Sequence, residues 1–390
     1  MSPWFSATAV VPALMEQWSI TSGQAAWLTM TVQGGFVIGA LLSALLNLPD
    51  LWEPRRVFAF GAVMAATSNA LIPALHADFG AALALRLASG MALALVYPVG
   101  MKLMATWTRA DRGLAIGMLV GALTVGKAAP HLVKALGSVG AWDNVMYAVS
   151  GLALLGGTTG WFAGKSGPYS VPTPPFHWRH MGKSLGDRSL RLANYGYLGH
   201  MWELYAMWTW VPLFVLASFR ASGMAETVGE GTMQSLASLS AFAVIGVGGL
   251  GSIVAGIVAD RWGRTRTAIV SLVVSGSCAA CIGLCFGRSP LLVVGVALVW
   301  GFSVVADSAQ FSSSVSELSD REYIGTQLTT QTAMGFLLTL ISIRFIPSVM
   351  DLVGWTWTFA VLVPGPVFGV WAMWRLLRSA DAAKLAEGRG

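Results

Sequence analysis

Charged residues are scarce in this chain. Only 11% of its 390 residues are aspartate, glutamate, lysine or arginine, whereas hydrophobic residues make up 55%. A soluble globular domain carries roughly 25% charged residues, so this chain lacks the polar side chains for a water-facing surface of ordinary size. The composition therefore excludes an ordinary soluble protein and predicts one whose surface largely faces lipid.

Cysteines are also few, and the common motifs of nucleotide-binding proteins and hydrolases are missing. The three cysteines, Cys278, Cys281 and Cys285, fall in one apolar segment, with no histidine or carboxylate nearby in the sequence to complete a four-ligand zinc shell. The chain has no Walker phosphate-binding loop, serine triad or metalloprotease motif. We therefore expect no metal, no cofactor and no enzyme.

Apolar segments recur along the whole chain and are separated by short polar breaks. All but the first approach or exceed the roughly 20 residues that a membrane-spanning helix needs. The short first segment predicts either a truncated first helix or a true start codon upstream, and we favour the second. Counting it, the pattern predicts twelve spans: Met1–Met15, Gln24–Leu46, Arg56–Leu75, Phe79–Met101, Gly113–Leu136, Val145–Ala163, Leu192–Phe219, Ser235–Ala259, Ala268–Phe286, Leu291–Ser314, Ile324–Ser348 and Trp355–Leu377.

The longest polar interruption is a basic segment, residues 165–191. It contains a cluster of prolines through which no helix continues. It predicts a cytoplasmic linker between two six-helix bundles, residues 1–164 and 192–377, with a cytoplasmic tail at 378–390.

The distribution of positive charge orients these helices. With the N-terminus inside, the cytoplasmic gaps, linker and tail hold 18 of the 24 lysines and arginines, and the external gaps hold only Arg220 and Arg288. Lysine and arginine accumulate in cytoplasmic loops, so we expect a multi-pass protein of the cell inner membrane with both termini cytoplasmic. Because the basic residues lie in scattered loops, the net charge of +6 does not indicate nucleic-acid binding.

The break after the eighth segment carries a distinctive pattern, G-x-x-x-D-R-x-G-R-x-R. Two glycines allow close helix approach and a sharp turn, and an aspartate at the helix end can pair with an arginine across the interface. Such pairing would hold the inner ends of the helices together, whereas the alternative is an ordinary basic loop. The proposed gating residues are Gly256, Asp260, Arg261, Gly263 and Arg264.

This loop, the twelve segments and the central linker resemble the major facilitator superfamily of secondary transporters. The segments that begin at Gly199 and Trp300 look like those of a poorly characterised bacterial branch. The resemblance implies an all-α membrane protein with two six-helix bundles that rock about a central site, usually driven by protons. Its expected partners are a small-molecule substrate, protons and membrane lipid, and we expect a monomer.

Charged residues inside the fourth and fifth segments are candidates for the substrate site, because such residues are costly in lipid unless they are paired or face water. Arg86 and Tyr97 share one face of the fourth segment, in a pattern that resembles the family's R-x-x-x-G. Arg86 is either a functional residue or a structural arginine bound to backbone carbonyls. Lys127, His131 and Lys134 form a cationic stripe on the fifth segment. Alternatively, Lys134 reaches the outer surface and His131 caps a helix end.

Polar residues recur in the seventh, tenth and eleventh segments. Glu203 lies near His200 on the seventh segment. A carboxylate in the middle of a span must be paired, protonated or exposed to water, so Glu203 is a plausible proton carrier. The other polar residues are expected to line a cavity, although hydrogen bonding between helices is the alternative for each. These cavity candidates are Asp307, Gln310, Gln327 and Gln331.

The cations Arg86, Lys127 and Arg344 within spans favour a small organic anion slightly over a cationic drug. Alternatives remain: a drug/proton antiporter, a transport-inactive membrane sensor on the same fold, or an intramembrane enzyme built on His200 and Glu203. The fifth segment lacks the glycine-proline ending typical of antiporters, which leaves the direction of coupling open.

Overall fold

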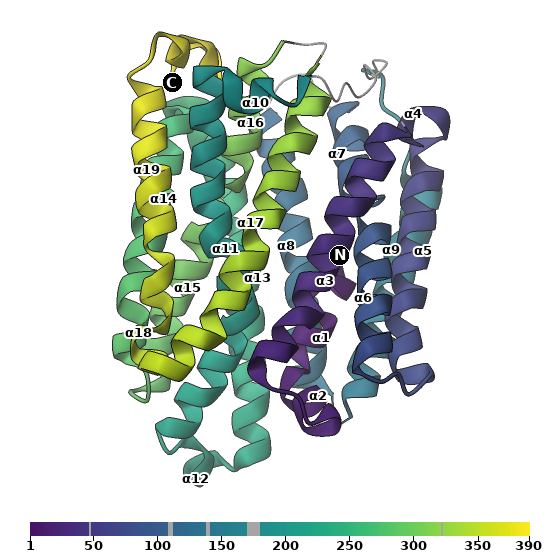
Figure 1. Cartoon of the computed structure of the whole chain (residues 1–390), viewed down its shortest axis with the longest axis vertical. Helices are drawn as coiled ribbons and strands as arrows, with labels where there is room; N and C mark the ends of the chain where they lie inside the picture. The colour runs from purple at the N-terminus through teal and green to yellow at the C-terminus, as the bar shows by residue number, and fades with distance from the viewer. Residues whose placement is uncertain (47, 108–111, 138–140, 170–179, 321–322) are drawn as a thin grey trace.

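The computed structural model describes the whole chain except residues 47, 108–111, 138–140, 170–179 and 321–322 (Figure 1). Within the described ranges every regular element is a helix, and eleven helices are long and apolar enough to cross a membrane. The middle of the expected linker, with Arg179, lies outside the described residues, as do Arg109 and Arg321.

The spanning helices of the first half follow the expected segments closely. They are α3 (Ser22–Leu45), α5 (Pro54–Ala74), α6 (Phe79–Leu93) continued by α7 (Tyr97–Ala105), α8 (Arg112–Leu136) and α9 (Trp142–Ala163).

The second half has six further spans. They are α11 (Arg188–Ala221), α13 (Glu230–Trp262), α14 (Arg264–Cys281) with η3 (Ile282–Cys285), α15 (Pro290–Ala306) continued by α16 (Ser308–Leu318), α17 (Ile324–Val353), and α18 (Trp355–Thr358), η5 (Phe359–Leu362) and α19 (Pro364–Leu377) in series. Short helices lie between or after these spans: α4 (Leu48–Leu51), α10 (Lys183–Gly186), α12 (Met224–Val228) and η6 (Ala380–Gly388).

The short first apolar segment is not one helix. It forms three pieces, η1 (Ser2–Phe5), α1 (Ser6–Ala9) and α2 (Val11–Trp18), and is not among the eleven helices that are long enough to span. Pro3 and Pro12 stand in the first turns of η1 and α2, where a missing backbone N–H is tolerated. The pieces pack against α3, α8 and α9.

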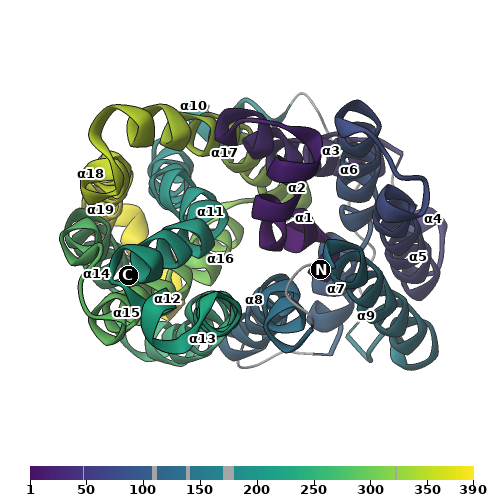
Figure 2. The same cartoon turned by 90° about the horizontal axis from the view of Figure 1, so that it is seen from below.

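The two halves lie side by side, with the first half on the right and the second on the left in Figure 2. They meet along two helix pairs, α8 with α13 and α3 with α17. Gly121 and Gly249 face each other in the first pair, where a Cβ on either glycine would lie 3.0 Å from the other's carbonyl oxygen. Small residues let these backbones approach closely.

The fourth span of each half is broken near its middle. The chain turns at residues 94–96 between α6 and α7, where Pro98 stands in the first turn of the new helix. It turns again at Asp307 between α15 and α16. The sequence pattern had indicated continuous helices at Phe79–Met101 and Leu291–Ser314. Pro98 explains the first break, because proline cannot continue the backbone hydrogen bonding of the preceding turn.

Neighbouring glycines in α3 provide a matched test of this packing. A Cβ on Gly35 would lie 2.1 Å from the Leu87 carbonyl oxygen of α6, whereas one on Gly34 meets nothing within 4 Å. We expect Gly35→Ala to cost about 1–3 kcal/mol or more of stability through overpacking. Gly34→Ala should be neutral or slightly stabilising, since alanine favours helix over glycine. Thermal unfolding of the two variants in detergent would contradict this packing if their midpoints were equal.

Candidate functional site

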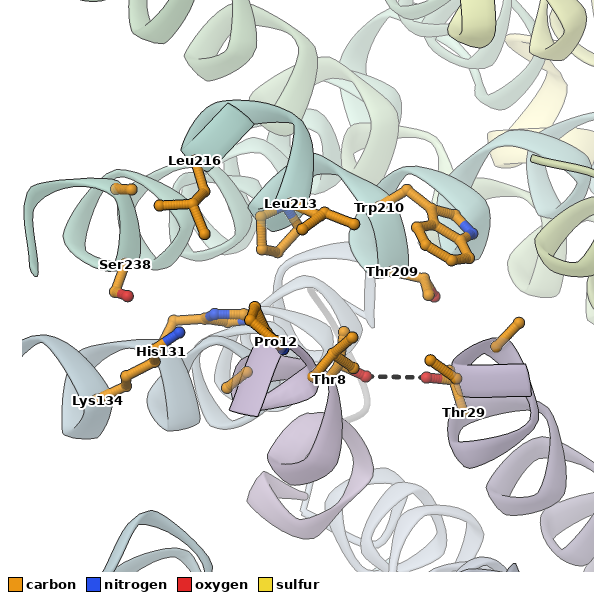
Figure 3. Close-up of a pocket in the computed structure, with 16 residues that line it drawn as sticks. Thr8, Pro12, Thr29, His131, Lys134, Thr209, Trp210, Leu213, Leu216 and Ser238 are labelled. Carbon is orange, nitrogen blue, oxygen red and sulfur yellow. Dashed lines mark hydrogen bonds between the residues drawn. The ribbon is translucent and has the colours of Figure 1, made fainter. Parts of the chain in front are cut away.

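Two cavities lie along the face of α8 that carries the cationic stripe. The first, here called the His131 cavity, lies towards the end of the molecule that carries α2 and α12 (Figures 1 and 3). His131 and Lys134 of α8 stand beside Ser238 of α13 on one side, and the hydroxyls of Thr8 and Thr29 are hydrogen-bonded at 2.8 Å on the other.

The second cavity, here called the Lys127 cavity, lies between the two halves. Its walls come from η1, α3, α7 and α8 of the first half and from α11, α15, α16 and α17 of the second. The volume open to the centres of water molecules is about 70 Å³, against about 30 Å³ in the His131 cavity. Because one water needs roughly 10–15 Å³ of such volume, both cavities can hold water, and the Lys127 cavity is the roomier of the two.

Lys127 is the main charged side chain of this cavity. It is 1% exposed, and its ammonium donates a hydrogen bond to the hydroxyl of Tyr205. Its Nζ lies 4.4 Å from the ring centroid of Trp4, 4.5 Å from that of Tyr205 and 4.9 Å from that of Trp208. These distances are in the range of cation–π attraction. The ammonium therefore sits inside an aromatic cage built from both halves of the chain.

The cage continues into a larger aromatic cluster. The ring of Trp4 lies 5.0 Å from Phe36 and 5.3 Å from Phe336, and Tyr205 lies 5.0 Å from Phe336 between centroids. Tilted and edge-on pairs at such distances are favourable beyond simple burial. The η1 segment and helices α3, α11 and α17 are thus packed together at the cavity wall.

His200 and Asp307 form a buried pair beside the cavity. Nδ1 of His200 lies 2.8 Å from Oδ1 of Asp307, and its Nε2 lies 3.1 Å from the hydroxyl of Ser308, which lines the cavity. The angle at the first contact departs from hydrogen-bond geometry, so we treat the contact as electrostatic. Among the described residues, neither carboxylate oxygen of Asp307 has a hydrogen-bond partner.

Glu203 lies in a separate polar pocket of the same bundle. The indole N–H of Trp300 donates to one of its carboxylate oxygens at 2.6 Å, and the hydroxyl of Ser275 donates to the other at 2.9 Å. Glu203 is fully buried and is not among the cavity-lining residues. His200 and Glu203, expected to act together, therefore have different immediate partners.

Arg86 is enclosed by backbone carbonyls. Its guanidinium donates to the carbonyl of Leu28 in α3 and to those of Pro3 and Trp4 in η1, as well as to the hydroxyl of Ser6. It lines neither cavity. This environment favours the structural alternative for Arg86, while Tyr97, about three turns further along the segment, does line the Lys127 cavity.

The three glutamines that were expected to line a cavity have different surroundings. Gln310 accepts a hydrogen bond from Arg264 at 3.4 Å, and Gln327 accepts one from Ser184 of α10 while donating to the His180 carbonyl. Gln331 is buried, and both its amide atoms lack a partner among the described residues. None of the three lines either cavity. Arg344 is exposed and lies 3.5 Å from the Ser348 hydroxyl.

The loop between α13 and α14 forms an ionic cluster. Arg264 contacts the Asp260 carboxylate at 2.8 Å within the same turn and the Glu317 carboxylate of α16 at 3.1 Å. Asp260 was expected to pair with an arginine across the helix interface. Its partner is instead Arg264, an arginine of the same loop. Gly263 has φ of 109°, a conformation that L side chains rarely adopt. Gly256 is buried at the end of α13, and Arg261 is exposed.

The tail packs onto this ionic cluster. The backbone N–H of Ala386 donates to Glu317 at 2.9 Å, and Arg389 donates to the carbonyl of Asp260 at 2.6 Å. Within the described part of the chain, no group of three histidine, cysteine, aspartate or glutamate side chains could hold a metal ion.

Comparison with known families agrees with the helical architecture. The family model of the Major Facilitator Superfamily matches residues 1–250 and 221–390, which together cover the chain. The chain therefore belongs to the Major Facilitator Superfamily, and the expected all-α membrane fold is confirmed. It is a multi-pass membrane protein of a family whose members are transporters rather than enzymes. A search of curated proteins found no match.

Sequence reasoning did not identify the aromatic cage. Tyr205 and Trp208 are three residues apart and so share a helix face, but nothing in the sequence brings Trp4 or Lys127 next to them. Trp300 and Ser275, the partners of Glu203, lie on two other helices, and nothing in the sequence pairs them with it.

The two interpretations of Arg86 predict different outcomes for its removal. Arg86→Met would leave several buried acceptors of η1 and α3 unsatisfied, at about 1–3 kcal/mol each. We expect a loss of about 3 kcal/mol or more, seen as a lower unfolding midpoint in detergent. Arg344→Met, at an exposed position, is the control and should unfold like the wild type. An Arg86→Met protein of undiminished stability would instead return Arg86 to the list of functional candidates.

Proposed function

We propose that this protein is a secondary active transporter that moves a small organic anion across the inner membrane of a bacterium by alternating access, coupled to protons. The observation that carries the proposal is the set of buried ionisable groups around one central cavity. Lys127 and His200 line its wall, Asp307 contacts His200, and Glu203 is buried in a polar pocket of the same bundle. Ionisable residues within spans are expensive and mark substrate or proton pathways.

Proton coupling is supported by the partners of Glu203. Only Trp300 and Ser275 donate to it among the described residues, and neither is a cation. An ionised carboxylate without a buried counter-charge is costly in this environment, so binding a proton relieves a large penalty. The hydroxyl of Ser275 can rotate to follow that change, whereas the indole N–H donates in both states.

Alternating access is supported by the two interfaces between halves. The α8–α13 contact is close because glycines face each other there, and small residues present no side chains that interlock. At the end that carries the tail, the ionic cluster of Asp260, Arg264 and Glu317 ties the α13–α14 loop to α16. We propose that this cluster gates that end in one of the two states.

A drug/proton antiporter is the less favoured function. Export of a cationic drug calls for a carboxylate at the cavity wall, yet among the described lining residues of the Lys127 cavity the ionisable groups are basic or phenolic. A transport-inactive sensor would be expected to lose polar groups around the cavity, whereas His200, Ser308 and Tyr97 retain them.

Coupling can be tested at Glu203. We expect Glu203→Gln to abolish accumulation driven by a pH gradient while leaving solute exchange, because the amide keeps the shape and cannot carry the proton. The measurement compares gradient-driven uptake with counterflow in proteoliposomes, using labelled small carboxylates. Glu230→Gln is the control, since Glu230 is exposed and pairs with Arg220 at the surface. Normal gradient-driven accumulation by Glu203→Gln would remove Glu203 from the coupling mechanism.

Orientation is tested by labelling single cysteines in a variant whose three native cysteines are replaced by alanine. Gly186 of α10 is exposed, and a side chain there meets no atom within 4 Å. If the linker and both termini are cytoplasmic, an impermeant maleimide should label Gly186→Cys in inside-out vesicles and not in spheroplasts. Glu226→Cys, on exposed α12 at the opposite end, should show the reverse. Labelling of Gly186→Cys in intact spheroplasts contradicts the proposed topology.

A further inference from the structure

We infer that the Lys127 cavity binds a monocarboxylate with a flat, apolar body, whose carboxylate contacts the Lys127 ammonium and whose body packs among the surrounding rings. This inference rests on the proposed transport of an organic anion and narrows it to one chemical class.

The ammonium of Lys127 lacks a counter-charge. Its hydrogen-bond partner among the described residues is the neutral hydroxyl of Tyr205. The nearby buried carboxylates have other partners: Asp307 faces His200, and Glu203 accepts from Trp300 and Ser275. A buried charge without an opposite charge is strongly unfavourable. A bound anion would supply the missing charge and accept the remaining ammonium hydrogens.

The side chains that line the cavity favour a ligand with one negative charge. Among the described residues that line the cavity, Lys127 and His200 are the ones with basic side chains. His200 already faces the carboxylate of Asp307 at 2.8 Å. Among the described lining side chains, Lys127 is therefore the cation without a carboxylate partner, and it matches one carboxylate on the ligand.

The rest of the wall specifies an apolar body. Beyond the cage of Trp4, Tyr205 and Trp208, the rings of Phe36 and Phe336 face the cavity, and most other lining side chains are aliphatic. Rings and aliphatic side chains make up most of this wall, so a flat hydrocarbon can stack on the rings. The aliphatic lining residues are Met1, Met101, Ile116, Val120, Leu123, Met201, Leu204, Val305 and Ala309.

A purely structural lysine is the competing explanation. Three rings within 5 Å can stabilise a buried cation by themselves. In that case removing the charge would leave ligand binding unchanged. The two explanations therefore differ in the effect of ligand charge and of Lys127 on binding, which can be measured on the purified full chain.

Benzoate is the probe, because it combines one carboxylate with a flat ring. Its binding is measured in detergent by titration calorimetry and by tryptophan fluorescence. Three further compounds distinguish the contribution of the carboxylate from that of the ring. Benzyl alcohol lacks the charge, benzylamine reverses it, and acetate lacks the ring. We expect benzoate to bind at least tenfold more tightly than each of them. Equal binding of benzyl alcohol or benzylamine overturns the inference.

Two lysines of α8 give a matched pair of variants. Lys127→Met should weaken benzoate binding at least tenfold, whereas Lys134→Met, in the His131 cavity, should change it less than twofold. Unchanged affinity in a folded Lys127→Met protein overturns the inference. If Lys127→Met does not fold, Lys127→Arg replaces it. This variant keeps the charge and should retain the preference for benzoate over benzylamine, and loss of that preference again overturns the inference.

Failure of this site and failure of the proposed transport can be told apart. Benzoate binding that depends on Lys127, without proton-driven uptake into proteoliposomes, would leave the site intact and overturn the transport proposal. Proton-driven accumulation of another solute that is insensitive to Lys127→Met would do the opposite.

Discussion

Lipid offers no hydrogen bonds, and this constraint governs the interior of the protein. Each polar group buried in the bundle must find its partner within the chain or pay for its absence. Arg86 meets the constraint by donating to the carbonyls of Pro3 and Trp4 in the broken first segment, and to that of Leu28 in α3. Its guanidinium thereby replaces the hydrogen bonds that a continuous helix would have made internally, and it joins the first segment to the bundle.

The same constraint separates structural from functional polar groups. Arg86 and Gln327 form hydrogen bonds with partners in the chain, so they leave no hydrogen bond for a ligand to make. Lys127, Asp307 and Gln331 are equally buried but less completely paired among the described residues. Unpaired buried groups are costly to folding, and two of these, Lys127 and Asp307, lie at or beside the Lys127 cavity, where the proposed transport cycle would use them.

The fold was largely predictable from the sequence, because span length and loop charge follow from the order of apolar and charged residues along the chain. Helix ends were less predictable. Asp187 caps α11 by accepting the N–H groups of Ser189 and Leu190, so the helix begins four residues before its apolar stretch. The site was less predictable. His200 and Glu203 lie one turn apart, yet they pair with Asp307 and with Trp300, respectively. Such pairing depends on how distant helices rotate against each other, and a single helix pattern carries no information on that rotation.

The breaks in the fourth span of each half have an electrostatic consequence. Helices α7 and α16 both begin in the interior, at Tyr97 and at Ser308, and both residues line the Lys127 cavity. A helix N-terminus carries a partial positive charge of roughly half a unit. At α16 the carboxylate of Asp307 stands at the cap and offsets it, whereas α7 has no acidic residue in its first turn. Because α6 ends at Leu93, its carboxyl end offsets part of the charge at α7, and the two breaks differ chiefly by the carboxylate of Asp307.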